Sequence, residues 1–200
     1  MIQVMGEGIG KSEIVAASQG DEKAFERLVE TYQRPIYNLA LRMLHSRSEA
    51  EDVAQDIFLH LLGILDRYDP ERPFEPWLFR VGTNFILNHL KRRRLETVSM
   101  ESLRQPGDPD APAVDIEDPA SSTTAPVEQS EEQETLKAAV AELPPDWRAV
   151  ITLHYIQSFS VNDIASILEI PVGTVKNRLF RARNLLYEKL QKLLETWSGA

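Results

Sequence analysis

Residues 95–135 divide the chain into two parts. This segment carries one basic residue against 11 acidic ones, and prolines recur in and around it at 106, 109, 112, 119 and 126. No Phe, Trp or Tyr occurs from Leu95 to Asp146. Few apolar groups combined with high net charge cannot offset the entropy lost on ordering, so a mobile linker of about 30 residues is predicted here. The chain must then fold as two small domains, each with a marginal core.

Both flanking parts show helical patterns. Apolar residues recur at three- and four-residue steps from Asp21 to Leu44, where Pro35 should kink or split the helix. Ser48 followed by Glu51 is typical of a capping box and predicts the start of the next helix. Further helices are expected over 74–94, 132–142, 147–157, 161–168 and 172–194. Because no alternating apolar run appears, the predicted class is all-α, with domains at 10–95 and 132–197 and the flexible acidic linker at 96–131.

The charge distribution leaves a nucleic-acid partner open. The whole chain has a net charge of −9, but residues 95–135 account for −10 of it, and residues 136–200 are net +2. The absence of cysteine excludes disulfides and thiol chemistry. No window reaches the roughly 18 apolar residues of a membrane span. The first ten residues do not resemble a secretory signal, so a cytoplasmic protein without a membrane segment is expected.

Enzyme interpretations find little support. Residues 6–12, GEGIGKS, resemble a phosphate-binding loop, but Met5 stands where the pattern needs glycine and no strand precedes it. A flexible tail is the preferred interpretation of this segment. The four histidines do not pair at metal-binding spacing on one helix face. We therefore expect neither an enzyme nor a cofactor.

The C-terminal part carries a helix-turn-helix pattern. Ala165 is small enough for two helices to cross closely, and Pro171 opens the second helix, where its missing N–H costs nothing. The second helix places an apolar stripe opposite a donor-rich face. That face comprises Thr174, Asn177, Arg178 and Arg181, with Lys176 and Arg183 at its flanks. It suits the major groove of DNA, although a basic amphipathic surface helix would show the same pattern.

The predicted helix 74–94 has a similar division. Its polar face carries Arg80, Thr83, Asn84, Asn88 and Lys91, with Trp77 at the edge. From Pro76 to Arg94 there are five basic residues and no acid. Basic groups beside aromatic and amide groups suit phosphate contacts and base stacking. A solvated basic helix end would explain the terminal cations equally well, but not the poor helix formers on this face.

The helix predicted to start at Ser48 is acidic over its first two turns. Glu51, Asp52, Gln55 and Asp56 lie close together there. Acids at a helix start are ordinary dipole chemistry, and a docking surface for a basic partner is the sharper alternative.

Taken together, these segments resemble bacterial sigma factors. Residues 20–25 (GDEKAF), 51–58 (EDVAQDIF) and 76–84 (PWLFRVGTN) resemble region 2, and residues from Leu143 through 171–183 (PVGTVKNRLFRAR) resemble region 4. With only these two regions and a linker, the chain is similar to the extracytoplasmic-function sigma factors.

The resemblance implies a role for each segment. The clamp helices of the β′ subunit of core RNA polymerase would bind Asp52, Gln55 and Asp56. The β subunit of the polymerase would be a further contact. Promoter DNA would be melted at the −10 element by the loop and helix that carry Tyr68, Phe74, Trp77, Arg80, Thr83, Asn84, Asn88 and Lys91. The −35 element would be read by Thr174, Lys176, Asn177, Arg178 and Arg181. The resemblance also allows an anti-sigma factor as a partner.

A second interpretation comes from a different class of protein. A free-standing two-domain helix-turn-helix regulator would bind its operator without polymerase. The acidic cluster at Asp52, Gln55 and Asp56 and the second basic face favour the sigma-factor interpretation.

Overall fold

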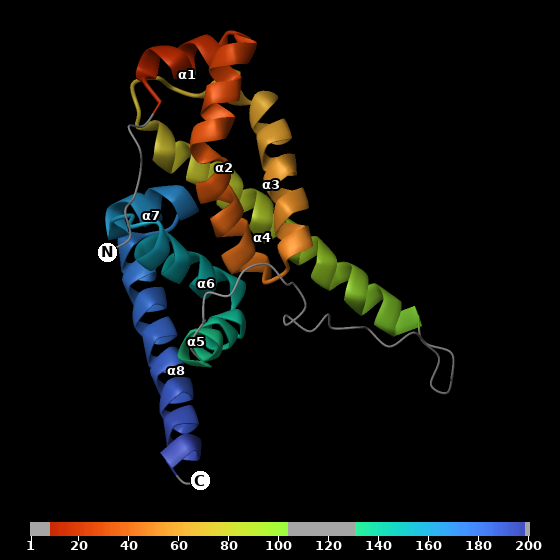
Figure 1. Ribbon diagram of the computed structural model, residues 1–200, viewed down its shortest axis with the longest axis vertical. Helices are drawn as coiled ribbons and strands as arrows, with labels where there is room; N and C mark the ends of the chain where they lie inside the picture. Colours follow the sequence, from red (N-terminus) through yellow and green to blue (C-terminus); the bar gives the residue numbers. More distant parts are fainter. Residues whose placement is uncertain (1–8, 104–130, 199–200) are drawn as a thin grey trace.

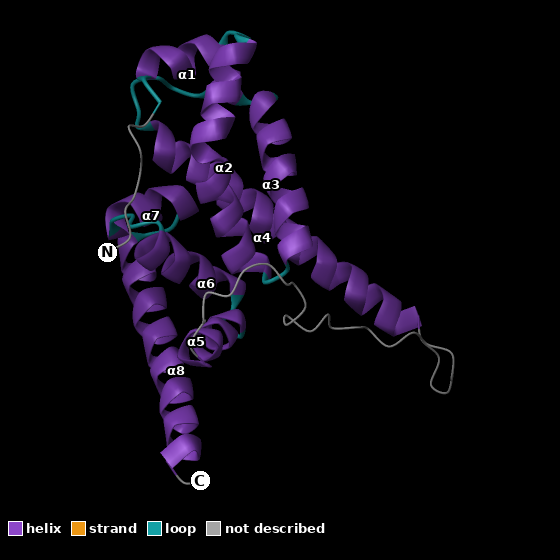
Figure 2. Cartoon of the chain, viewed as in Figure 1, coloured by secondary structure: helices purple, strands orange, loops and turns teal. Residues whose placement is uncertain are grey.

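The structure is a computed structural model that describes residues 9–103 and 131–198, and all regular structure in these two ranges is helical (Figures 1 and 2). The predicted all-α class is therefore confirmed. The first range holds α1 (Lys11–Ser18), α2 (Glu22–Leu44), α3 (Arg47–Leu62), the 3-10 turn η1 (Leu65–Arg67) and α4 (Phe74–Leu103). The second holds α5 (Glu131–Ala141), α6 (Pro145–Ile151), the π-helical turn η2 (Thr152–Ile156), α7 (Val161–Leu168) and α8 (Val172–Ser198). Within these ranges no helix is long and apolar enough to cross a bilayer.

The N-terminal domain is built around α2, which contacts α1, α3 and α4. Its core is formed by fully buried aliphatic side chains from three helices, among them Leu39, Ile57 and Leu78. Gly82 lets α4 approach α2 closely, because a Cβ at this position would lie 3.4 Å from Cδ1 of Ile36. The packing of α4 on α2 thus depends on a glycine within α4.

Two predictions for the helices of this domain fail. The split predicted at Pro35 is wrong, because Pro35 lies inside one continuous helix whose buried side chains on either side of it, Tyr32 and Ile36, hold both halves in the same core. The cap of α3 is Ser46, not Ser48. The Ser46 hydroxyl accepts a hydrogen bond from the Glu49 amide at 3.4 Å, so α3 begins at Arg47.

The ends of the predicted linker also differ from the expectation. α4 continues past Arg94 as far as Leu103, and α5 begins at Glu131. The linker predicted at 96–131 otherwise lies outside the described residues. At the N-terminus, Lys11 and Ser12 begin α1 and are not part of a tail. Lys11 pairs with Glu71 at 2.8 Å, which ties α1 to the loop before α4.

The C-terminal domain contains the predicted helix-turn-helix. α7 ends at Leu168, and Glu169 adopts the left-handed conformation (φ 54°) that glycine most often adopts at a helix end. Pro171 directly precedes α8. The apolar stripe of α8 is buried, as its pattern predicts, at Val175, Leu179 and Ala182.

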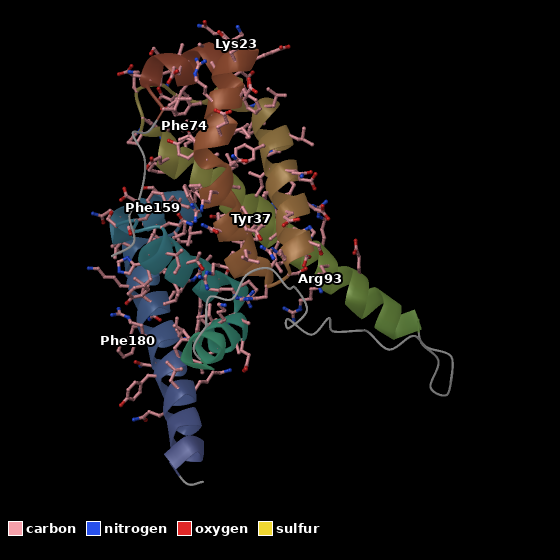
Figure 3. All side chains as sticks on the ribbon, in the orientation of Figure 1. Lys23, Tyr37, Phe74, Arg93, Phe159 and Phe180 are labelled. Carbon is pink, nitrogen blue, oxygen red and sulfur yellow. The ribbon has the colours of Figure 1, made fainter. Side chains whose placement is uncertain are left out.

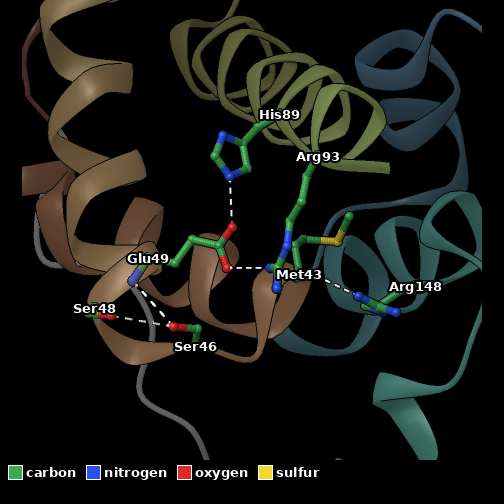
Figure 4. Close-up of polar contacts among 7 residues, drawn as sticks. All are labelled: Met43, Ser46, Ser48, Glu49, His89, Arg93 and Arg148. Carbon is green, nitrogen blue, oxygen red and sulfur yellow. Dashed lines mark hydrogen bonds and ion pairs between the residues drawn. The ribbon is translucent and has the colours of Figure 1, made fainter. Parts of the chain in front are cut away.

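The two domains pack against each other. The sequence, which indicated two domains joined by a mobile linker, did not predict this contact. α4 contacts α7 and α6, and α2 contacts η2 and α6 (Figure 1). The rings of Phe79 and Phe159 meet edge to face, with their centroids 4.9 Å apart. Arg148 donates from Nη1 to the carbonyl oxygen of Met43 at 2.5 Å, at the end of α2 (Figure 4). Each small domain thereby buries apolar surface that it could not cover alone.

Candidate nucleic-acid interface

The polar face of α4 remains accessible. Asn84, Asn88 and Lys91 are exposed, and Arg80 is half-buried. These four side chains border a hollow of about 680 Å³ whose lining also includes the aromatic pair His60 and Phe85. Arg80 Nη1 lies 3.2 Å from Oε1 of Glu169 in the helix-turn-helix. The structure therefore gathers cations, amides and rings around one concave surface, and links its edge to the other domain.

Thr83 does not belong to this surface. It is fully buried, and its Oγ1 has no hydrogen-bond partner within the described ranges. The prediction that Thr83 shares the exposed face with Asn84 is wrong, because Thr83 lies one helical turn after Phe79 on the side of α4 that carries the inter-domain aromatic contact.

The predicted aromatic residues form a packed cluster. Tyr68 and Phe74 are buried, and their rings meet edge to face with centroids 5.1 Å apart. The ring centroid of Trp77 lies 5.3 Å from that of Tyr68 and 5.8 Å from that of Phe74. Burial raises the pKa of Tyr68, whose hydroxyl donates to the Arg72 carbonyl at 2.5 Å. Tyr68 and Phe74 thus support the loop from within, and the half-buried Trp77 is the ring of this cluster that solvent reaches most.

Glu49 fixes the direction of the basic part of α4. Its Oε1 lies 2.7 Å from Nε2 of His89 and its Oε2 lies 2.8 Å from Nη1 of Arg93 (Figure 4). The Glu49 side chain is only 20% exposed. Since Glu49 belongs to the first turn of α3, this three-residue cluster holds α4 across the start of α3.

The donor face of α8 forms a second concave surface. Thr174, Asn177, Arg178 and Arg181 line a hollow of about 450 Å³ together with Gly173 and with Trp147 from α6. Asn177 and Arg181 are exposed, and Thr174 and Arg178 are half-buried. Lys176 is exposed and does not line the hollow, in keeping with its place at the flank of the helix face.

The acidic face of α3 is exposed and includes apolar residues that the sequence analysis missed. Asp52, Gln55 and Asp56 are all exposed. Leu59 is 69% exposed and Leu62 is 55% exposed, at helical spacing that continues the same face. The spacing alone could have identified both leucines, since neither falls on the buried side of α3, which carries Val53 and Ile57.

Comparison with known proteins defines the class first. Residues 28–96 match the model of Sigma-70 region 2, and residues 133–186 match that of Sigma-70, region 4. These two regions in this order are the hallmark of a sigma-70 factor.

Similar individual proteins define the subgroup. The chain is 34% identical over 189 residues to the ECF RNA polymerase sigma factor SigW of Bacillus subtilis, covering 92% of this chain and 97% of the relative. It is 35% identical to the RNA polymerase sigma-H factor of Pseudomonas aeruginosa, covering 88% and 91%. The solved structure of CnrH in complex with the cytosolic domain of CnrY matches with a TM-score of 0.65 at 25% identity, over 91% of this chain and 97% of that one. The chain belongs to the extracytoplasmic-function sigma factors.

Proposed function

We propose that the protein docks on core RNA polymerase through α3 and directs it to promoters by reading DNA with α4 and α8. The observation that carries the proposal is the separation of three solvent-accessible side-chain sets on three helices of one chain. One set is acidic and apolar, and two are rich in donors and concave. A free-standing regulator needs a DNA face, but binding to DNA alone does not require the exposed set on α3.

The docking surface on α3 consists of Asp52, Gln55, Asp56, Leu59 and Leu62. Two exposed leucines beside two carboxylates fit a partner surface that is basic and apolar. The clamp helices of the β′ subunit are the partner that we assign to it, with the β subunit as a contact for the second domain. Charge complementarity at such a surface steers association and sets specificity.

A charge reversal tests the docking surface. Asp56→Arg should lower the affinity for core polymerase about tenfold or more, because it places like charges face to face. Glu30→Arg is the matched control, since Glu30 is an exposed acid on α2. Both variants should keep the helical circular dichroism of the parent. Equal affinities of the parent and Asp56→Arg for core would refute the assignment of α3.

We assign the −10 element to the hollow on α4. A protein that opens DNA must hold a base out of the stack, and unstacking that base costs a few kcal/mol. Asn84 offers both a donor and an acceptor to the edge of such a base, and Arg80 and Lys91 offer charge to the backbone. Trp77 offers a ring at the start of the same helix.

We assign the −35 element to the hollow on α8. Arg178 and Arg181 would contact base edges, with Thr174 and Asn177 beside them, and Lys176 would contact phosphate. A lysine at the flank adds affinity for any sequence, whereas an arginine in the hollow adds preference for particular base pairs.

Regulation and location follow from the family. CnrH was solved together with the cytosolic domain of CnrY, and on that likeness we propose that a second protein also binds this chain directly. The family resemblance makes an anti-sigma factor the partner that we assign. We assign the protein to the cytoplasm, where the polymerase and the template are. We further propose that it acts by binding, without catalysing a step of its own and without a cofactor.

A further inference from the structure

The guanidinium of Arg178 is held by a carboxylate from outside the helix-turn-helix. Its Nη2 lies 3.2 Å from Oδ2 of Asp146, which belongs to the first turn of α6. The Arg178 side chain is 24% exposed and that of Asp146 is 58% exposed. The two residues are 32 positions apart, so this pair connects α6 to the recognition helix α8.

The same neighbourhood forms part of the concave surface on α8. Trp147, which follows Asp146, lines the hollow together with Arg178 and Arg181. α6 therefore contributes both a wall of the hollow and a charge beside it. The surface that we assign to the −35 element is built from two helices, of which the helix-turn-helix supplies only one.

We infer that Asp146 is a positioning residue that sets the base preference of Arg178. The inference rests on the proposed contact of Arg178 with DNA. Arginine has a long side chain with many rotamers, and a guanidinium that is ordered before binding loses less freedom on binding. With Nη2 engaged by the carboxylate, the remaining N–H donors are restricted to fewer directions. A fixed donor pair is what bidentate reading of a guanine requires.

Two other roles for Asp146 make different predictions. If its charge only repelled phosphates, removing it would strengthen binding to every DNA sequence by a similar factor. If it only tethered α6 to α8, removing it would lower the melting temperature and leave the relative preference among sequences unchanged. A positioning role instead changes preference at particular base pairs, and only while Arg178 is present.

The test uses the complete chain with purified core polymerase and a promoter library randomised across the upstream element. Arg178→Ala should reduce the preference at one or two adjacent base pairs about tenfold. Asp146→Ala should reduce the preference at the same base pairs, and Asp146→Asn, which keeps an oxygen acceptor, should restore part of it. Asp146→Ala should add nothing in the Arg178→Ala background, because the two residues act as one unit. Glu188→Gln, which removes an exposed carboxylate ten residues further along α8, should leave the preference unchanged.

Three outcomes would overturn the inference. A uniform gain for all sequences in Asp146→Ala points to repulsion, and a lower melting temperature without a change in preference points to a tether. Equal effects of Asp146→Ala with and without Arg178 show that the two side chains act independently. A different result, no change of preference in Arg178→Ala itself, would contradict the proposed contact of Arg178 with DNA. The Arg178→Ala variant therefore distinguishes a failure of the proposed function from a failure of the role of Asp146 alone.

Discussion

Thr83 and Asn84 are neighbours in the chain with opposite surroundings. Asn84 is exposed at the hollow on α4, whereas Thr83 is fully buried and its hydroxyl finds no partner among the residues that the structure describes. A buried polar atom without a partner carries a desolvation cost of about 1–3 kcal/mol. The helical pattern predicted both on one polar face, and their poor helix propensity favoured a functional role for that face. Neither property distinguishes a solvent-facing residue from one that a second domain covers.

The buried hydroxyl predicts a stabilising substitution. Thr83→Val keeps the shape and the β-branch but removes the unpaired oxygen, so it should raise the free energy of unfolding by about 1 kcal/mol. Thr83→Ser keeps the hydroxyl and deletes a buried methyl, and should be destabilising by a similar amount. Urea denaturation of both variants measures this. Destabilisation by Thr83→Val would mean that the oxygen has a partner.

His45 predicts how stability depends on pH. It ends α2 in the left-handed conformation (φ 61°), and burial, followed by the charges of Arg148 and Arg42, lowers its pKa from 6.5 to about 4. Between these two pH values the unfolded chain takes up a proton that the folded chain does not. The contribution of His45 to the free energy of unfolding is therefore constant above pH 6.5 and is lost as the pH falls toward 4. Between pH 7.5 and pH 5 the loss should be about 2 kcal/mol.

The matched variant isolates this residue from other titrating groups. His45→Asn tolerates the left-handed backbone and does not titrate. Its unfolding free energy, measured in urea at the same two pH values, should fall by about 2 kcal/mol less than that of the parent. An identical fall in both proteins would show that His45 is not responsible.

At the scale of elements, α4 carries much of the proposed function. Its sequence predicted an apolar and a polar side, and the structure exposes Asn84, Asn88 and Lys91 as expected. The pattern could not show that Glu49 would clamp His89 and Arg93, because their spacing is set by how α3 crosses α4. It also could not show that α4 continues to Leu103, since the acidic composition beyond Arg94 indicated a linker.

The exposed side of α4 predicts a defect in strand opening. Asn84→Ala should leave core binding intact and reduce permanganate reactivity of unpaired thymines on a linear promoter, because the extruded base loses its amide partner. On a template with a pre-melted bubble the defect should shrink without vanishing. Gln33→Ala removes an exposed amide from α2 and serves as the control. Normal opening by Asn84→Ala on linear DNA would exclude Asn84 from melting.

At the scale of the whole molecule, the two domains share one apolar core. An aromatic contact joins Phe79 to Phe159, which Figure 3 labels. An ion pair joins Arg80 to Glu169, and Arg148 donates a hydrogen bond to the carbonyl oxygen of Met43. The last two pairs are 89 and 105 positions apart. Sequence periodicity identified each domain, but it reports only neighbours along a helix, so contacts over such separations could not be predicted from it.

The domain contact can be tested with a cross-link, since the chain has no cysteine. Arg80→Cys with Glu169→Cys replaces an ion pair whose atoms lie 3.2 Å apart. A short reagent with two thiol-reactive groups, such as a bis-maleimide, should alkylate both cysteines and so link the two positions within one chain. Adding Phe159→Ala should lower the yield, because it removes an aromatic contact worth about 0.5–1.5 kcal/mol beyond its buried area. A yield that is the same in denaturing urea would mean that the domains do not pack together.

The central claim is that this chain selects promoters only as part of RNA polymerase. Run-off transcription with purified core, the complete chain and a library of random linear templates tests it most directly. We expect transcripts only when core and chain are both present, from templates enriched for two sequence elements at a fixed separation upstream of the start. Asp56→Arg should abolish the enrichment at concentrations where the parent saturates core. Sequence-specific binding of DNA by the chain alone, unchanged by core and without selected transcripts, would contradict the account and identify a free-standing regulator.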